Sequence, residues 1–206
     1  MKIAVLVSGT GSNHQAILDA VAAGTLALRV ALVVADRRGA GALARAEAAG
    51  VPTRVLGPRS FPDRDAFDAA LAEACLAAGA GLVVLAGFMR VLGPRFLDVW
   101  EGRCLNVHPS LLPAFPGVDA PAQALAYGVR VSGCTVHLVD RGTDTGPIVL
   151  QSAVAVLAGD TPQTLHRRIQ AEEWRLLPQA VGLFAAGRQS LRGRLVEIAE
   201  EADADA

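Results

Sequence analysis

Two polar side chains, Asn106 and His108, are spaced two residues apart in the run Asn106-Val107-His108-Pro109. If this run ends a strand, both side chains point to one face of it, about 6–7 Å apart. An amide and an imidazole in that arrangement can stabilise a developing oxyanion and move a proton. The alternative is a satisfied polar pair at a strand end. The prolines at 109 and 113 make the pattern more specific than a lone histidine.

The connection from Asp140 to Gly146 carries a second acidic candidate, Asp144. A carboxylate in such a loop can reach a cleft, pair with a histidine and hold the imidazole ring in its protonated form. A solvated turn acid is the alternative interpretation. For Asp140, a solvated turn acid and a functional role are equally favoured interpretations.

A glycine-containing loop, Ser8-Gly9-Thr10-Gly11-Ser12-Asn13, separates the first predicted strand from the first predicted helix. The free amides and positive dipole end of a helix N-terminus suit a phosphate group. An ordinary turn between a strand and a helix is the alternative. The loop also begins like a dinucleotide-binding motif, with Asp36 placed to bind a ribose. However, the third glycine of that motif falls at His14, so a single phosphate is favoured over a pyrophosphate.

Several other kinds of site are disfavoured by residue type or spacing. Lys2 is the only lysine, which sets aside a P-loop lysine and a Schiff-base lysine. Cys104 and His108, with Cys134 and His137, have the residue types of a metal site. Cys134 and His137 are three apart on a predicted strand and face opposite sides, so no metal is expected. The sequence contains no G-x-S-x-G serine-hydrolase motif.

Composition indicates a cytoplasmic protein that acts on small molecules. The formal net charge of −1 gives no electrostatic basis for nucleic-acid or membrane binding. The most apolar run, residues 81–89, is strand-sized and far short of the ~20 residues of a membrane-spanning helix. The three cysteines lack a C-x-x-C pair, as expected in a reducing compartment. A monomer and a homodimer are both compatible with the sequence.

Apolar periodicity and capping residues predict alternating strands and helices through the first two thirds of the chain. The predicted strands are 2–7, 27–35, 53–56, 82–86, 103–107, 129–139 and 147–156. The predicted helices are 13–23, 40–49, 63–78, 94–100, 122–127 and 164–186, with Pro178 expected to break or kink the last of them.

This order predicts an α/β fold with a single domain. Its mostly parallel, Rossmann-like sheet would have helices on both faces, and the two late strands would form an antiparallel extension near the C-terminus. We expect the domain to span residues 1–188. Residues 189–206 would be a C-terminal extension, partly frayed over its acidic end from Glu200 to Ala206.

The motifs together resemble the folate-dependent formyltransferases, from about Lys2 to about Gly187. The matching segments are residues 8–13, Ala86-Gly87-Phe88-Met89-Arg90, residues 105–113, residues 140–148 and Gln170-Ala171-Glu172-Glu173. The resemblance implies transfer of the formyl group of 10-formyltetrahydrofolate, a co-substrate, to the amine of 5-phosphoribosylglycinamide in purine biosynthesis. It implies no metal.

The resemblance also implies a role for each matching residue. Asn106, His108 and Asp144 would be catalytic, with Asn106 and protonated His108 stabilising the oxyanion. The substrate phosphate would rest on Gly11, Ser12 and Asn13, and the amine end would lie near Gln170 and Glu173. The folate-binding residues would be Arg64, Met89, Arg90, Val91, Leu92, Asp140, Arg141, Gly142 and Thr143.

One segment departs from the family pattern, and several rival functions remain. Asp119 stands where the family often has histidine, and Pro121 precedes a predicted helix. Formyltetrahydrofolate hydrolase usually adds an N-terminal regulatory domain, whereas the first strand here begins at Lys2. Methionyl-tRNA formyltransferase usually adds a C-terminal domain and a basic surface, unlike this nearly neutral chain. An NAD(P)-binding oxidoreductase and an inactive binding module are the rivals of other classes.

Overall fold

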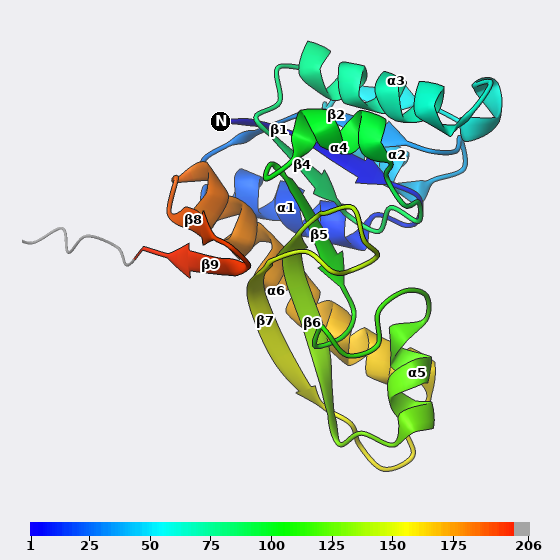
Figure 1. The fold of residues 1–206 in the computed structure, drawn as a ribbon, viewed down its shortest axis with the longest axis vertical. Helices are drawn as coiled ribbons and strands as arrows, with labels where there is room; N and C mark the ends of the chain where they lie inside the picture. The colour runs from blue at the N-terminus through cyan, green and yellow to red at the C-terminus, as the bar shows by residue number, and fades with distance from the viewer. Residues whose placement is uncertain (200–206) are drawn as a thin grey trace, which may run out of the picture.

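The structure is a computed structural model that describes residues 1–199. The predicted fraying of Glu200 to Ala206 lies outside the described residues. The fold class is as predicted: one α/β unit has a mostly parallel sheet and an antiparallel extension (Figure 1).

The strands and helices alternate nearly as the periodicity predicted. The strands of the main sheet are β1 Lys2–Val7, β2 Arg29–Ala35, β3 Thr53–Val55, β4 Leu82–Leu85, β5 Cys104–His108, β6 Val131–Leu138 and β7 Ile148–Ala155. The helices are α1 Ser12–Ala22, α2 Gly41–Ala48, α3 Arg64–Ala77, α4 Pro94–Trp100, α5 Ala120–Tyr127 and α6 Pro162–Ala185, with a 3-10 turn at Pro58–Ser60.

The seven-stranded sheet has the order β3-β2-β1-β4-β5-β6-β7. The strands from β3 to β5 pair in parallel, whereas β5 pairs with β6, and β6 with β7, in antiparallel fashion. The strand order reverses between β1 and β4. Open α/β sheets bind ligands at such a switch point, beyond the carboxyl ends of the strands.

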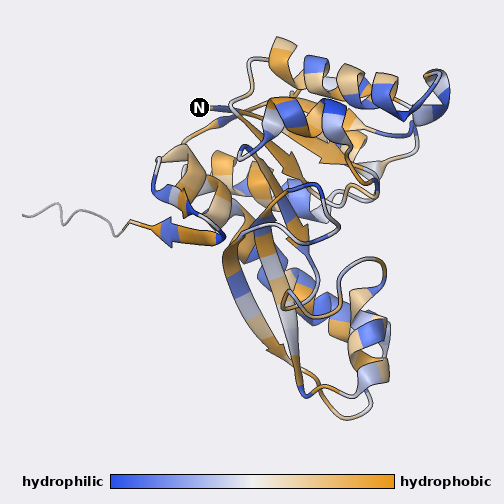
Figure 2. Cartoon of the chain, in the orientation of Figure 1, coloured by the Kyte–Doolittle hydropathy of each residue, from blue (hydrophilic) through white to orange (hydrophobic). Residues whose placement is uncertain are grey.

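Alternate residues of the central strands enter two separate hydrophobic cores. Ile3, Val5 and Val7 of β1 pack in the core beneath α1 and α6, whereas Ala4 and Leu6 pack beneath α3 and α4. Figure 1 shows these helix pairs on opposite sides of the sheet, and Figure 2 shows the central strands hydrophobic along their length. Both faces are therefore covered, which explains why these strands read as continuous apolar runs.

Pro178 does not break α6, and Pro121 lies inside α5 rather than ahead of it. Helix α6 continues through Pro178 to Ala185, although proline supplies no helical N–H there. Buried neighbours such as Leu177 and Val181 pack this part of the helix into the core, which offsets the lost hydrogen bond. Pro121 does not precede α5 but lies in its first turn, where no N–H is needed.

A two-stranded antiparallel hairpin follows α6, where strands were not predicted. It consists of β8 Gln189–Arg192 and β9 Leu195–Ile198. The boundary at residue 188 stays a prediction, and the hairpin begins directly after it. No helix within residues 1–199 has the length and apolar character needed to cross a membrane.

Candidate active site

Three predicted site segments converge at the switch point. The Gly11–Asn13 loop follows β1, residues 89–92 follow β4, and Asn106 and His108 occupy the last part of β5. Because β1, β4 and β5 are parallel neighbours, their carboxyl ends share one edge of the sheet. The topology thus brings together residues that lie far apart in the sequence.

Asn106, His108 and Asp144 form one cluster. The Nδ1 atom of His108 lies 3.3 Å from Oδ2 of Asp144, and both side chains are largely buried. The Asn106 amide nitrogen lies 3.5 Å from Oδ1 of the same carboxylate. The expectation that Asp144 reaches a histidine from its loop is met in this geometry.

Both ring nitrogens of His108 face oxygen acceptors. The Nε2 atom is 2.9 Å from the carbonyl oxygen of Phe115, and Nδ1 faces Asp144. A neutral imidazole has only one N–H, so it can donate to only one of the two oxygens. A ring that carries both protons can donate to both oxygens.

The Asp144 carboxylate is held as an anion. Burial pushes its pKa upward, but hydrogen bonds from His137 and the Gly117 amide, together with the charges of His108 and His137, outweigh burial and lower the pKa. The Gly117 N–H donates to Oδ2 at 2.8 Å. Asp144 itself has a left-handed backbone, with φ 55°. The loop geometry is therefore strained at the residue that carries the charge.

A second histidine, His137, belongs to this cluster, and sequence reasoning treated it only as an unsuitable metal ligand. Its Nε2 lies 3.1 Å from the Asn106 amide nitrogen and 3.6 Å from Asp144. Its Nδ1 faces the Leu138 carbonyl oxygen at 2.9 Å. The signal that would have found it is strand register, because β5 and β6 pair Asn106 opposite His137.

The glycine loop is shaped by close packing at Gly11. This residue has φ 77°, and a Cβ on it would lie 2.5 Å from the Cβ of Ala42. Only glycine is compatible with both conditions. Gly11 is the N-cap of α1, so the amides of the first helical turn have no acceptor within the helix and can donate to an anion.

The predicted phosphate and amine residues meet in pairs. The Gln170 amide donates to the Ser12 hydroxyl at 3.3 Å, and the Asn13 amide donates to the Glu173 carboxylate at 2.9 Å. Glu173 is 3% exposed. Burial raises its pKa, partly opposed by the Asn13 hydrogen bond. Helix α6 thus supplies a polar face directly beside the loop.

Asp36 and His14, the two residues that decide the dinucleotide alternative, do not have the environments that a dinucleotide site needs. Asp36 is buried and forms an ion pair with Arg90 at 2.7 Å. His14 is fully buried, and neither ring nitrogen has a hydrogen-bond partner within residues 1–199. Burial, followed by the charge of Arg45, lowers the pKa of His14 to about 4. A neutral imidazole therefore occupies the position where the dinucleotide motif has glycine.

A cavity of about 320 Å³ lies over the cluster. Besides Asn106, His108 and Asp144, its lining includes these predicted folate residues: Met89, Arg90, Val91, Leu92, Asp140, Gly142 and Thr143. Asp119, Pro121 and His137 also line it, as does His166, which sequence reasoning missed although it lies one helical turn before Gln170. Arg64 and Arg141 are engaged elsewhere, with the Val91 carbonyl and the Asp98 carboxylate respectively.

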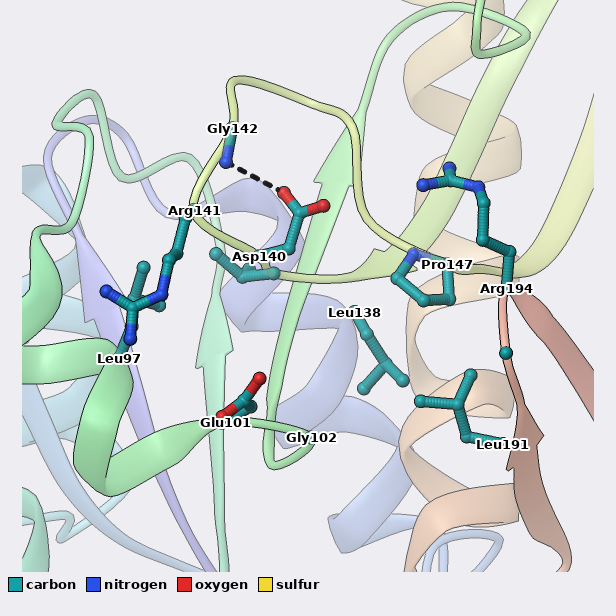
Figure 3. A pocket seen from close by; sticks show the side chains of 12 residues that line it. Leu97, Glu101, Gly102, Leu138, Asp140, Arg141, Gly142, Pro147, Leu191 and Arg194 are labelled. Carbon is teal, nitrogen blue, oxygen red and sulfur yellow. Dashed lines mark hydrogen bonds between the residues drawn. The ribbon is translucent and has the colours of Figure 1, made fainter.

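A second cavity, of about 410 Å³, lies behind the loop that carries Asp144 (Figure 3). Figure 3 shows the Asp140 carboxylate turned inward to the Gly142 amide, a contact of 3.0 Å, and Arg141 directed toward Leu97 of α4. Arg194 of the C-terminal hairpin donates to the Thr145 carbonyl oxygen at 2.7 Å. The loop is therefore supported from the side opposite the cluster.

No group of three or more His, Cys, Asp and Glu residues within 1–199 is arranged to hold a metal ion. The three cysteines are buried and unpaired. Burial raises the pKa of Cys75 and Cys134 to about 12, so neither has the character of a reactive thiolate.

The fold and site define an open α/β protein with a ligand cleft at the switch point and a histidine–carboxylate pair on its wall. A family model described as formyl transferase matches residues 1–181, and the chain belongs to this family. The resemblance inferred from the motifs is thereby confirmed, and the oxidoreductase and hydrolase alternatives are not favoured.

Similar proteins cover nearly the whole chain. Phosphoribosylglycinamide formyltransferase of Mycobacterium tuberculosis is 51% identical over 203 residues, which are 96% of this chain and 94% of that protein. The crystal structure of glycinamide ribonucleotide transformylase 1 from Symbiobacterium toebii has 53% identity and a TM-score of 0.96, covering 97% of this chain and 94% of that one. The human trifunctional purine biosynthetic protein adenosine-3 is 42% identical over 202 residues, 97% of this chain but 20% of its own length.

Proposed function

We propose that this protein transfers the formyl group of 10-formyltetrahydrofolate to the amine of 5-phosphoribosylglycinamide, a step of purine biosynthesis. The observation that carries the proposal is the meeting of Asn106, His108 and Asp144 on the wall of one cavity at the switch point. Relatives that match almost the full chain and carry the name phosphoribosylglycinamide formyltransferase support it.

We assign the ribonucleotide phosphate to Gly11, Ser12 and Asn13. The first turn of α1 offers amide donors and a positive dipole end to an anion. Gln170 and Glu173, which contact this loop through Ser12 and Asn13, would then face the rest of the ribonucleotide on its amine side.

Formyl-folate supplies an electrophilic formyl carbon, whose oxygen gains negative charge as the amine attacks. Asn106 is assigned as one donor to that oxygen. The Asn106 amide nitrogen lies 3.1 Å from Nε2 of His137. Its contact with Asp144 is long, at 3.5 Å, so the amide hydrogen on that side is the one assigned to the substrate. A donor of this kind contributes about 3–4 kcal/mol to lowering the barrier.

His108 is assigned as the second donor and as the proton-transfer group. Asp144 faces Nδ1, which leaves Nε2–H to act on the substrate. That hydrogen points to the Phe115 carbonyl oxygen, so it must exchange this partner for a substrate oxygen during the reaction. The Asp144 carboxylate stabilises the imidazolium through the exchange.

The folate is assigned to the remaining cavity wall, formed by residues 89–92 with Asp140, Gly142 and Thr143. Arg64 and Arg141 are assigned to its edge. Met89 and Val91 are 76% and 56% exposed, and they offer apolar contact to a flat ring system. We further propose a cytoplasmic location, small-molecule partners without nucleic acid or membrane, and a monomer or homodimer.

The decisive experiment mixes purified protein with 10-formyltetrahydrofolate and glycinamide ribonucleotide while folate absorbance is followed. We expect formyl-folate to be consumed only when the ribonucleotide is present, with one formylated ribonucleotide formed per folate released. Consumption without the ribonucleotide would instead identify a hydrolase. No consumption under either condition, in protein that binds the ribonucleotide, would indicate an inactive binding module.

A further inference from the structure

The segment from Met89 to Gly93 is the last part of the connection from β4 to α4, and its residues 89–92 line the cavity. It has no regular helix or strand structure, and the side chains of Met89 and Val91 are largely exposed. Such a segment keeps one shape only if other elements hold its backbone.

Helix α3 holds this backbone at two points. The Gly93 N–H donates to Oδ2 of Asp68 at 2.7 Å. The Nε of Arg64 lies 3.6 Å from the same oxygen, and the Nη2 of Arg64 donates to the Val91 carbonyl oxygen at 2.7 Å. One buried carboxylate and its arginine therefore fix residues 91 and 93 together.

A buried carboxylate at position 68 lowers the stability of the fold. Its side chain is 1% exposed, and its Oδ1 has no hydrogen-bond partner within residues 1–199. Burial raises the pKa of Asp68, and the Gly93 amide and Arg64 oppose the shift only in part. A buried carboxylate with an unsatisfied oxygen reduces stability, so packing alone does not account for it.

The Asp68 carboxylate approaches Gly93 so closely that a side chain at position 93 would collide with it. A Cβ at position 93 would lie 2.5 Å from Oδ2 of Asp68. The φ of Gly93 is −97°, which any residue can adopt, so the requirement for glycine comes from the carboxylate rather than from the backbone. The contact between Asp68 and the segment can therefore be broken from either side.

We propose that Asp68 is a positioning residue for the formyl-folate subsite: it holds residues 91–93 in the shape that binds the folate and does not touch the folate itself. The inference deepens the proposed function and rests on it. Arg64 acts in the same unit, because its guanidinium is directed to the Val91 carbonyl oxygen and the Asp68 carboxylate.

Steady-state kinetics of Asp68→Ala, Asp68→Asn and Asp65→Asn test the proposal. We expect Asp68→Ala to raise the KM for 10-formyltetrahydrofolate about 10- to 100-fold, the effect of losing a hydrogen bond to a charged group. The KM for glycinamide ribonucleotide and kcat should change less than about 3-fold. Asp68→Asn keeps an acceptor for the Gly93 amide and should recover most of the loss. Asp65 is exposed on the same helix, so its variant is the matched control.

Gly93→Ala tests the contact from the other side and covers the case in which Asp68→Ala fails to fold. It should raise the folate KM similarly, and Asp68→Ala/Gly93→Ala should be no worse than Asp68→Ala, because the collision needs the carboxylate. An unchanged folate KM in folded Asp68→Ala or Gly93→Ala, or equal losses for both substrates, would overturn the proposal.

Amide hydrogen exchange separates this inference from the proposed function. Residues 91–93 should exchange faster in Asp68→Ala than in the wild type, whether or not the protein turns over formyl-folate. If the wild type shows no turnover but residues 91–93 exchange faster in Asp68→Ala, the proposed function is refuted and the positioning contact stands. If both proteins are active and residues 91–93 exchange at the same rate in Asp68→Ala as in the wild type, the positioning role alone is refuted.

Discussion

Replacing Asp144 by asparagine removes the charge from the His108 pair and leaves its shape in place. The variant keeps one oxygen that can accept the Gly117 N–H, so the loop should stay folded. At 3.3 Å, two unit charges interact by about 5 kcal/mol at an effective dielectric constant of 20. Neutralising one partner of a buried pair costs about 3–5 kcal/mol.

The lower end of that range applies here because the cavity is open to solvent. We expect a loss of about 3 kcal/mol in transition-state stabilisation, or roughly 150-fold in kcat/KM. The assay is formyl transfer followed by folate absorbance, with glycinamide ribonucleotide binding measured by calorimetry. Asp19→Asn is the control, since Asp19 is exposed on α1 and its contact is with Gln15. A kcat/KM within 5-fold of wild type in Asp144→Asn would refute the role given to the carboxylate.

Three further variants test other parts of the site. His14→Leu should stabilise the protein, and more so at pH 5 than at pH 8. The folded pKa of His14, about 4, lies below its ordinary 6.5. Wild-type stability therefore falls, by up to about 3 kcal/mol, as pH drops from 6.5 toward 4. Urea unfolding at both pH values checks this, and an equal effect at both would contradict it. Gly11→Ala should raise the ribonucleotide KM more than about 10-fold, because its Cβ would meet Ala42; an unchanged KM would remove Gly11 from the phosphate site. Glu173→Gln keeps an acceptor for Asn13 but loses the charge. It should preserve the melting temperature and raise the ribonucleotide KM about 10-fold, leaving the folate KM unchanged; a rise in the folate KM instead would place Glu173 at the wrong substrate.

Local sequence signals were sufficient for most of the fold. Continuous apolar runs identified β1 and β4 because both faces of these strands are covered. The observed boundaries of helices differ from the predicted ones where a capping interaction sets the end of the helix. Helix α6 starts at Pro162 rather than residue 164 because Thr161 and Thr164 form a capping box. The C-terminal hairpin was not predicted, since its strands are short and largely exposed and carry little hydrophobic pattern.

From residue spacing alone, only those site residues that are close together in the sequence could be placed side by side. Asn106 and His108 share a strand end, so their proximity follows from spacing alone. The contact of Asn13 with Glu173 joins residues 160 apart, and no local pattern relates them. The buried contact of Asp68 with Gly93 is similar, because α3 and the segment after β4 meet only through tertiary packing.

The antiparallel strand β6 explains why the cluster forms where it does. Because β6 runs antiparallel to β5, its register places His137 opposite Asn106, and the connection to β7 begins beside the start of β5. That connection then folds back over the sheet, where the left-handed backbone of Asp144 directs its carboxylate to both histidines. The reversed strand and the loop that follows it thus bring His137 and Asp144 to Asn106 and His108 at the switch point.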